Sequence, residues 1–175
     1  MKVLYSSKTG NTKKIAFVIA NELDIEIYEI NSSISIIDDE ILFVGFWVDK
    51  GEIDEIAKDF LLKTKDKKIA LFFTAGIEKE HEYVKEMIKK YVDYVNLNNE
   101  VLGCFMSQGK ISDEVIAKSK ELALKNPDNP RYAITEQRQK RWDESAKHPN
   151  KQDLKAAINF ANNIVNKFKE KQWIN

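Results

Sequence analysis

A short polar stretch near the amino terminus carries residue types that can bind a phosphate group. It consists of Ser7, Lys8, Thr9, Gly10, Asn11 and Thr12. The stretch follows an apolar run at 3–6 and precedes an amphipathic, helix-like segment at 15–23. A helix start leaves backbone N–H groups without partners and carries a partial positive charge, so it attracts anions. Hydroxyl groups can donate to phosphate oxygens, and Gly10 lets the backbone turn tightly. The pattern therefore predicts a phosphate site at the first helix start.

The chemistry of this loop favours a terminal monophosphate. It has one glycine, no glycine-lysine-hydroxyl ending and no G-x-G-x-x-G, which argues against nucleoside triphosphates and dinucleotides. No carboxylate for magnesium follows the first strand, because Ser7 and Lys8 stand there. Lys8 is expected to face solvent. Taken alone, a hydroxyl-rich loop also suits a plain helix cap without ligand.

Five short apolar runs provide the frame for this loop. They lie at 3–6, 25–30, 41–47, 69–74 and 101–106, with amphipathic helical segments between most of them. Such alternation predicts an α/β fold with a parallel sheet and helices on both faces. The segment 31–40 is too short for a full crossover helix, so a shortened helix or a loop is expected there.

Length and composition limit the function classes. The chain has 175 residues, with 28 basic and 28 acidic side chains, and predicts one domain over 1–175. A net charge of zero argues against nucleic acid or an anionic membrane as the partner. No secretion signal or long apolar run is apparent, which predicts a cytoplasmic protein. The single cysteine, Cys104, excludes an internal disulfide and is expected to be a small buried apolar residue.

A segment rich in proline and arginine precedes the last helix. All three prolines and all the arginines lie between Pro127 and Pro149, which predicts a polar helical excursion at about 127–150. Ser112 is expected to cap the helix before it, and Thr135 a short helix within it. A solvated excursion is the simpler interpretation, and a docking surface is the alternative. That surface would comprise Arg131, Tyr132, Arg138, Arg141 and Trp142.

The pattern Ser7-Lys8-Thr9-Gly10-Asn11-Thr12 after an amino-terminal strand resembles the phosphate loop of the flavodoxin family. The stretch from Asp38 to Gly51 is similar to that family's third strand and flavin loop, and the whole resemblance spans 1 to about 124. It implies a three-layer sandwich with a five-stranded parallel sheet of order 2-1-3-4-5, and FMN as the cofactor. Trp47 would stack on the flavin. The cofactor-binding residues implied are Ser7, Lys8, Thr9, Gly10, Asn11, Thr12, Phe46, Trp47, Val48, Asp49, Lys50, Gly51, Thr74, Ala75, Gly76 and Ser107.

The resemblance implies electron transfer rather than a catalytic site of the chain's own. Electron carriers of that family are mostly acidic, whereas this chain is neutral, which indicates a dedicated redox partner. Its carboxyl-terminal third resembles the flavodoxin-like proteins that accompany bacterial bilirubin reductases, so a bilirubin or other tetrapyrrole reductase is the expected partner.

Two other classes remain open at this point. One is an FMN-dependent NAD(P)H:quinone-type oxidoreductase, for which the two histidines, His81 and His148, offer no well-placed proton donor and are expected at the surface. The other is a cofactor-free interaction module, which a colourless protein without FMN uptake would indicate.

Overall fold

The computed structural model describes residues 1–31 and 41–173, so most of the expected loop or short helix at 31–40 lies outside the described residues. Five parallel strands run in the order β2-β1-β3-β5-β6, which confirms the predicted order. They are β1 (Lys2–Tyr5), β2 (Ile27–Glu29), β3 (Ile41–Asp49), β5 (Lys68–Ala75) and β6 (Glu100–Gln108). A sixth, two-residue strand, β4 (Glu52–Ile53), pairs antiparallel with the end of β3 and was not predicted.

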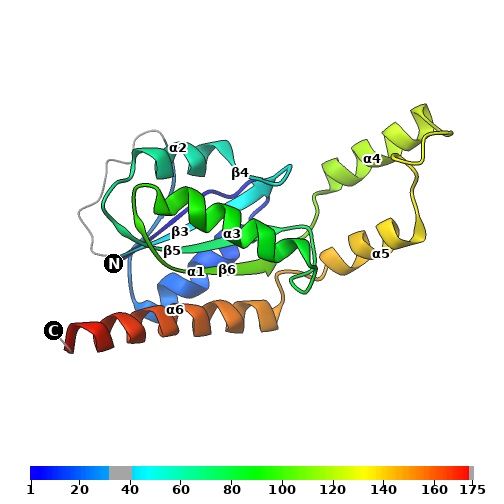
Figure 1. Ribbon diagram of the computed structural model, residues 1–175. Helices are drawn as coiled ribbons and strands as arrows, with labels where there is room; N and C mark the ends of the chain where they lie inside the picture. Colours follow the sequence, from blue (N-terminus) through cyan, green and yellow to red (C-terminus); the bar gives the residue numbers. More distant parts are fainter. Residues whose placement is uncertain (32–40, 174–175) are drawn as a thin grey trace.

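Helices cover both faces of the sheet, as predicted (Figure 1). On one face lie α1 (Asn11–Leu23) and α6 (Lys151–Trp173), and on the other α2 (Glu55–Lys63) and α3 (Tyr83–Asn96). Each face has its own core. One core joins residues such as Ile15, Ile19 and Ala157 to Phe43 and Phe72, and the other joins Phe60, Met87 and Tyr91 to Val44 and Phe73. The three-layer sandwich aligns the carboxyl ends of the strands at one end of the molecule.

The second core contains an aromatic cluster. Phe46 stacks on Phe73 with ring centroids 5.4 Å apart, and Tyr91 meets both rings edge-on at 5.3 and 5.2 Å. The Tyr91 hydroxyl donates a hydrogen bond of 3.0 Å to the Gly51 carbonyl oxygen. Desolvation raises the pKa of Tyr91, and burial raises the pKa of Cys104 to about 12. Cys104 packs against this core but is only partly buried, so it is more exposed than predicted.

The raised pKa values of Tyr91 and Cys104 predict a loss of stability in alkali. The Cys104 thiol ionises in the unfolded chain near pH 9 but stays neutral in the fold up to a pKa of about 12. Its contribution is therefore complete below pH 9 and is lost as the pH rises toward 12. We expect the free energy of unfolding to fall by roughly 2 kcal/mol between pH 8 and pH 10.5. Guanidinium unfolding at the two pH values measures this.

The variant Cys104→Ala should show a smaller decrease in the free energy of unfolding between pH 8 and pH 10.5, because it lacks the thiol that ionises in the unfolded chain. Tyr28→Phe is the matched control, since Tyr28 is 39% exposed. An unfolding free energy that stays constant from pH 8 to pH 10.5 in the native chain would contradict the explanation.

Two helices, α4 (Asp113–Lys125) and α5 (Glu136–Ser145), extend from the sheet on the right of Figure 1 and are called the arm below. Both predicted caps are present: Ser112 Oγ accepts from Val115 N at 3.3 Å, and Thr135 Oγ1 from Arg138 N at 3.1 Å. No residue of α4 is buried, whereas α5 buries Trp142 and Ser145. The excursion thus begins at α4, earlier than the predicted 127, because α4 leaves the sheet instead of packing on it.

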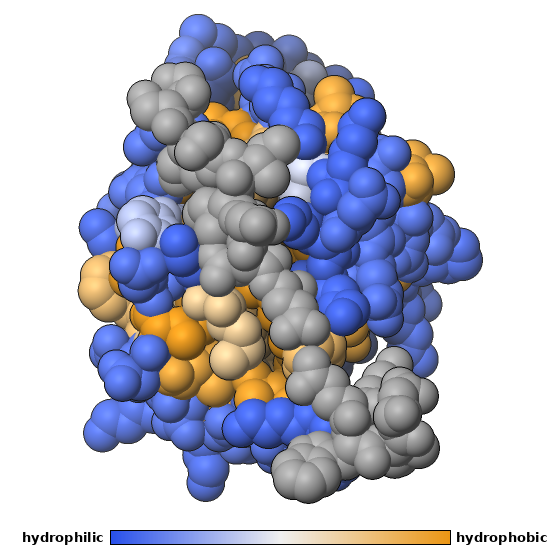
Figure 2. Space-filling model, turned by 90° about the vertical axis from the view of Figure 1, so that its left-hand side faces the viewer, coloured by the Kyte–Doolittle hydropathy of each residue, from blue (hydrophilic) through white to orange (hydrophobic). Residues whose placement is uncertain are grey.

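The opposite end of the sheet faces the viewer in Figure 2, with hydrophilic residues along its rim and apolar groups gathered toward the middle. Within residues 1–31 and 41–173, no helix combines the length and apolarity that crossing a bilayer requires. The polar loops that could hold a ligand lie at the other end, beside the arm.

Candidate functional site

The predicted phosphate loop joins β1 to α1 and is shaped by local hydrogen bonds. Gly10 adopts a left-handed conformation, with φ of 85°, immediately before α1. The Ser7 hydroxyl oxygen accepts from Gly10 N at 3.1 Å and from Lys13 N at 3.3 Å. Thr9 Oγ1 likewise accepts from Asn11 Nδ2 at 3.1 Å. Because both oxygens act as acceptors, each hydroxyl hydrogen stays available for donation to an anion.

The loop is anchored to the ends of two further strands. Asn11 Nδ2 donates to the Lys110 carbonyl oxygen at 2.9 Å, and the Thr12 and Thr74 hydroxyls lie 2.8 Å apart. A side chain at Gly109 would place its Cβ 2.9 Å from Asn11 Nδ2, so the Asn11 side chain would have to move. The loops after β1, β5 and β6 are thereby held as one unit.

Trp47 lies near the carboxyl end of β3, where it pairs with Thr74 of β5. The chain turns at Lys50 and Gly51, which both have positive φ, and returns through β4. Asp54 then holds this end of β3 through its side chain. Its carboxylate accepts from Ser6 Oγ at 2.7 Å, Trp47 N at 3.2 Å and Ala57 N at 3.1 Å. This 2% exposed carboxylate caps α2 and joins the ends of β1 and β3.

A cavity of about 400 Å³ lies between these loops. Its size falls in the range of small-molecule sites, roughly 300–1,000 Å³. The Lys8 ammonium lies over the Trp47 ring, 5.6 Å from its centroid, and both residues line the cavity. The lining residues that were predicted are Lys8, Thr9, Asn11, Trp47, Val48, Asp49, Lys50, Thr74, Ala75 and Gly76. The charged lining side chains are Lys8, Lys50 and Lys110 against Asp49, a balance that favours an anionic ligand.

The other predicted residues lie close by but do not line the cavity. Ser7, Gly10 and Thr12 shape the loop, and Gly51 lines a neighbouring groove. Phe46 is fully buried in the aromatic cluster. Ser107 is 1% exposed, and its hydroxyl donates to the Gln108 carbonyl oxygen at 3.0 Å. These last two side chains thus support the site from the interior.

Several lining residues were missed by sequence reasoning. They are Gly109, Lys110, Ile111, Ser112 and Val115, which follow β6 and open α4. Asp54 was missed as well, although an acidic residue directly before a helical stripe is a recognisable cap signal. The residues after β6 carry no comparable signal, because only the path of the arm brings them to the cavity.

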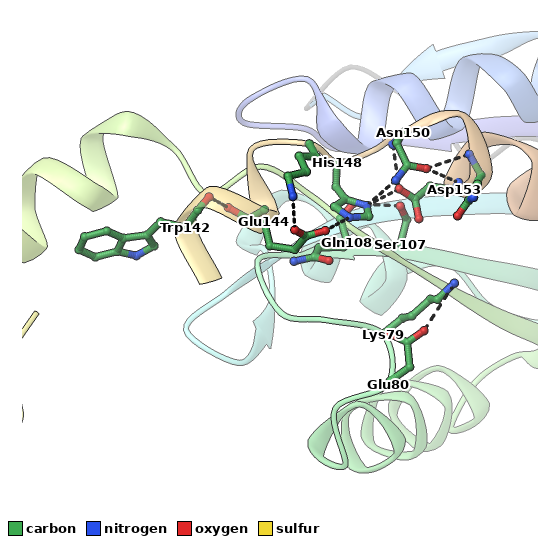
Figure 3. Close-up of polar contacts among 12 residues, drawn as sticks. Lys79, Glu80, Ser107, Gln108, Trp142, Glu144, His148, Asn150 and Asp153 are labelled. Atoms are coloured by element: carbon green, nitrogen blue, oxygen red, sulfur yellow. Dashed lines mark hydrogen bonds and ion pairs between the residues drawn. The ribbon is translucent and has the colours of Figure 1, made fainter. Parts of the chain in front are cut away.

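A separate polar cluster joins α5 to α6 (Figure 3). His148 Nδ1 lies 2.5 Å from Asp153 Oδ2, and its Nε2 lies 3.6 Å from Glu144 Oε1. The Asp153 carboxylate also accepts from Asn150 N at 2.8 Å. The hollow beside this cluster shares no lining residue with the cavity at Trp47. His148 is therefore held between two helices, rather than free at the surface as expected, and lies apart from the site.

Known proteins resemble this chain in sequence and in fold. The Flavodoxin domain family matches residues 2–162. This chain belongs to the flavodoxin family. The chain is 41% identical over 169 residues to the flavodoxin-like domain-containing protein BilS of Clostridioides difficile, covering 93% of this chain and 94% of that one.

Solved structures support the same fold for this chain. Oxidised flavodoxin 2 from Bacillus cereus aligns with a TM-score of 0.56 at 18% identity, over 95% of this chain and 97% of that one. A Lactobacillus acidophilus flavoprotein in complex with FMN aligns with a TM-score of 0.50 at 20% identity, over 67% of this chain and 95% of that one.

The residues at this cavity fit FMN chemically. The loop at Ser7 and Thr9 presents hydroxyl hydrogens beside the start of α1, where a phosphate dianion is stabilised. The N–H groups of Asn11 and Thr12 have no backbone partner among the described residues. Trp47 supplies an aromatic side chain in the same cavity, which suits a flat ring.

Proposed function

We propose that this protein binds FMN in the cavity at Trp47 and passes electrons between FMN and a dedicated partner, a bilirubin or other tetrapyrrole reductase. The observation that carries this proposal is that the hydroxyl-rich loop and Trp47 border one cavity at the carboxyl ends of the strands. Ligands of open parallel sheets bind at this end. When bound, FMN supplies one- and two-electron chemistry, and the protein holds and orients it.

Different residues of the chain would bind different parts of FMN. The loop from Ser7 to Thr12 would hold the phosphate through hydroxyl and backbone N–H donors, each contributing about 1.5–3 kcal/mol to a charged acceptor. Trp47 would pack against the flavin ring, which adds roughly 0.5–1.5 kcal/mol beyond the burial of its area. Lys50 and Asp49 would set opposing charges near the ring, and Gly76 would let the backbone approach it closely.

The proposed docking surface lies next to this cavity. Arg131, Tyr132, Arg138 and Arg141 line a groove between the arm and α3. Arg138 also holds the arm's turn, donating to the carbonyl oxygens of Tyr132 at 3.2 Å and Arg131 at 3.1 Å. Trp142 is 3% exposed, so it forms part of the groove wall, and the other four residues would make the contacts with the partner. The neutral net charge of the chain supports a local contact over long-range steering.

Titration of the purified apoprotein with FMN tests the proposal. We expect a yellow complex with one FMN per chain, and slow turnover of NADH or NADPH with a quinone by the isolated protein. A colourless protein that takes up no FMN would contradict cofactor binding. Rapid turnover of NADPH with a quinone would instead identify a stand-alone oxidoreductase.

A further inference from the structure

A second hollow adjoins the cavity at Trp47 and has a volume of about 480 Å³. It lies between the arm and the start of α3, and is called the arm groove below. The two hollows share lining residues, so a ligand in the arm groove would lie beside a ligand in the first cavity. The shared residues are Val48, Lys50, Ala75, Gly76, Ile111 and Val115.

Every charged side chain that lines the arm groove is positive. These side chains are Lys50, Arg131, Arg138 and Arg141. The whole chain has equal numbers of acidic and basic residues, so this segregation is local. Arg131 and Arg141 are exposed, and within the described ranges neither forms an ion pair. Their guanidinium groups can therefore bind an external anion, and the planar fork of arginine suits a carboxylate.

Apolar and aromatic side chains complete the walls. Tyr83 is 44% exposed and Val115 51% exposed, and both face this groove with Met87, Leu122 and Tyr132. Exposed apolar side chains gathered in a concave site favour a ligand with flat or bulky apolar surface. The cationic rim and the apolar walls together favour a ligand that has both negative charge and apolar surface.

We propose that the arm groove binds a planar conjugated molecule that carries two carboxylates, adjacent to the flavin. This deepens the proposed function and rests on it for the position of the flavin. The walls would cover the conjugated surface, while Arg131 and Arg141 would each bind one carboxylate. A small molecule is favoured over an acidic protein segment inside the groove, because the groove is concave and continuous with the first cavity through six shared residues. The proposed partner protein would then dock over the groove and enclose this molecule, rather than fill the groove itself.

Calorimetric titration of the FMN-loaded protein with naphthalene-2,6-dicarboxylate tests this, with the uncharged naphthalene-2,6-dicarboxamide as the matched ligand. We expect the dicarboxylate to bind at least about tenfold more tightly than the diamide, since only the dicarboxylate can form ion pairs with the two arginines. The variant R131Q/R141Q should bind the dicarboxylate about tenfold or more weakly than the native chain, with an unchanged affinity for FMN.

The control variant is Lys140→Gln, which removes one positive charge from α5, the helix that carries Arg141. Lys140 pairs with Glu136 at 2.7 Å and lines the hollow of the His148 cluster, so K140Q should bind the dicarboxylate like the native chain. Absence of dicarboxylate binding, equal affinity for the diamide, equal losses in K140Q and R131Q/R141Q, or displacement of FMN would each overturn the proposal. Arginine-dependent binding to a protein that takes up no FMN would refute the proposed function but retain the groove as an anion site.

Discussion

Replacing Asp54 by alanine is expected to lower the free energy of unfolding by about 3 kcal/mol and to weaken FMN binding at the same time. The carboxylate accepts three hydrogen bonds, from Ser6 Oγ, Trp47 N and Ala57 N, at a position that is 2% exposed. Alanine would leave the buried donors without a partner and remove the cap of α2. The Trp47 N–H would lose its acceptor, so the cavity wall at the end of β3 would be held less firmly. Denaturant unfolding and FMN titration of the same variant measure both effects.

Two further variants separate the contributions of Asp54. Ser6→Ala removes one donor and keeps the carboxylate, so it should cost about 1 kcal/mol and leave FMN affinity nearly unchanged. Asp54→Asn keeps one acceptor oxygen and should fall between the alanine variant and the native chain. A loss below about 1 kcal/mol in Asp54→Ala would show that this carboxylate does not organise the site.

Replacing Thr9 by valine is expected to weaken FMN binding by about tenfold to a hundredfold while riboflavin binding stays the same. Thr9 lines the cavity, and its oxygen already accepts from Asn11 Nδ2, so its hydroxyl hydrogen is free to donate to the phosphate. Valine keeps the shape and the β-branch but cannot donate. Riboflavin lacks the phosphate, and therefore reports on the ring site alone. Quenching of flavin fluorescence measures both affinities.

Thr9→Ser retains the hydroxyl and serves as the control, with FMN affinity expected near that of the native chain. An equal loss for FMN and riboflavin in Thr9→Val would indicate a general disturbance of the cavity. Full retention of FMN affinity would place the phosphate elsewhere.

The parts of the fold that depend on local pattern could be predicted from the sequence. The five parallel strands follow from short apolar runs separated by amphipathic helices, and their order from the resemblance to the flavodoxin family. The cap at Thr135 follows from a hydroxyl before a helical segment. The loop from Ser7 to Thr12 was placed correctly at the first helix because position along the chain fixes it.

Other features depend on contacts that no local pattern encodes. Phe46 and Trp47 are adjacent in sequence, but β3 directs Phe46 into the core and Trp47 into the cavity. Ile111 and Val115 reach the cavity only because α4 leaves the sheet, although its apolar spacing resembles that of a packed helix. The joint role of Ser6 and Asp54 needs the ends of β1 and β3 side by side, across 48 residues of sequence.

The phosphorus NMR spectrum of the FMN complex tests the central claim most directly. If the loop at Ser7 and Thr9 surrounds the phosphate with donors, the dianion is stabilised and its resonance should stay constant between pH 5.5 and pH 8. Free FMN, whose second phosphate pKa lies near 6 as in other phosphomonoesters, changes its shift over that range. A bound resonance that titrates like that of free FMN would contradict the account, because the phosphate would then lie in solvent.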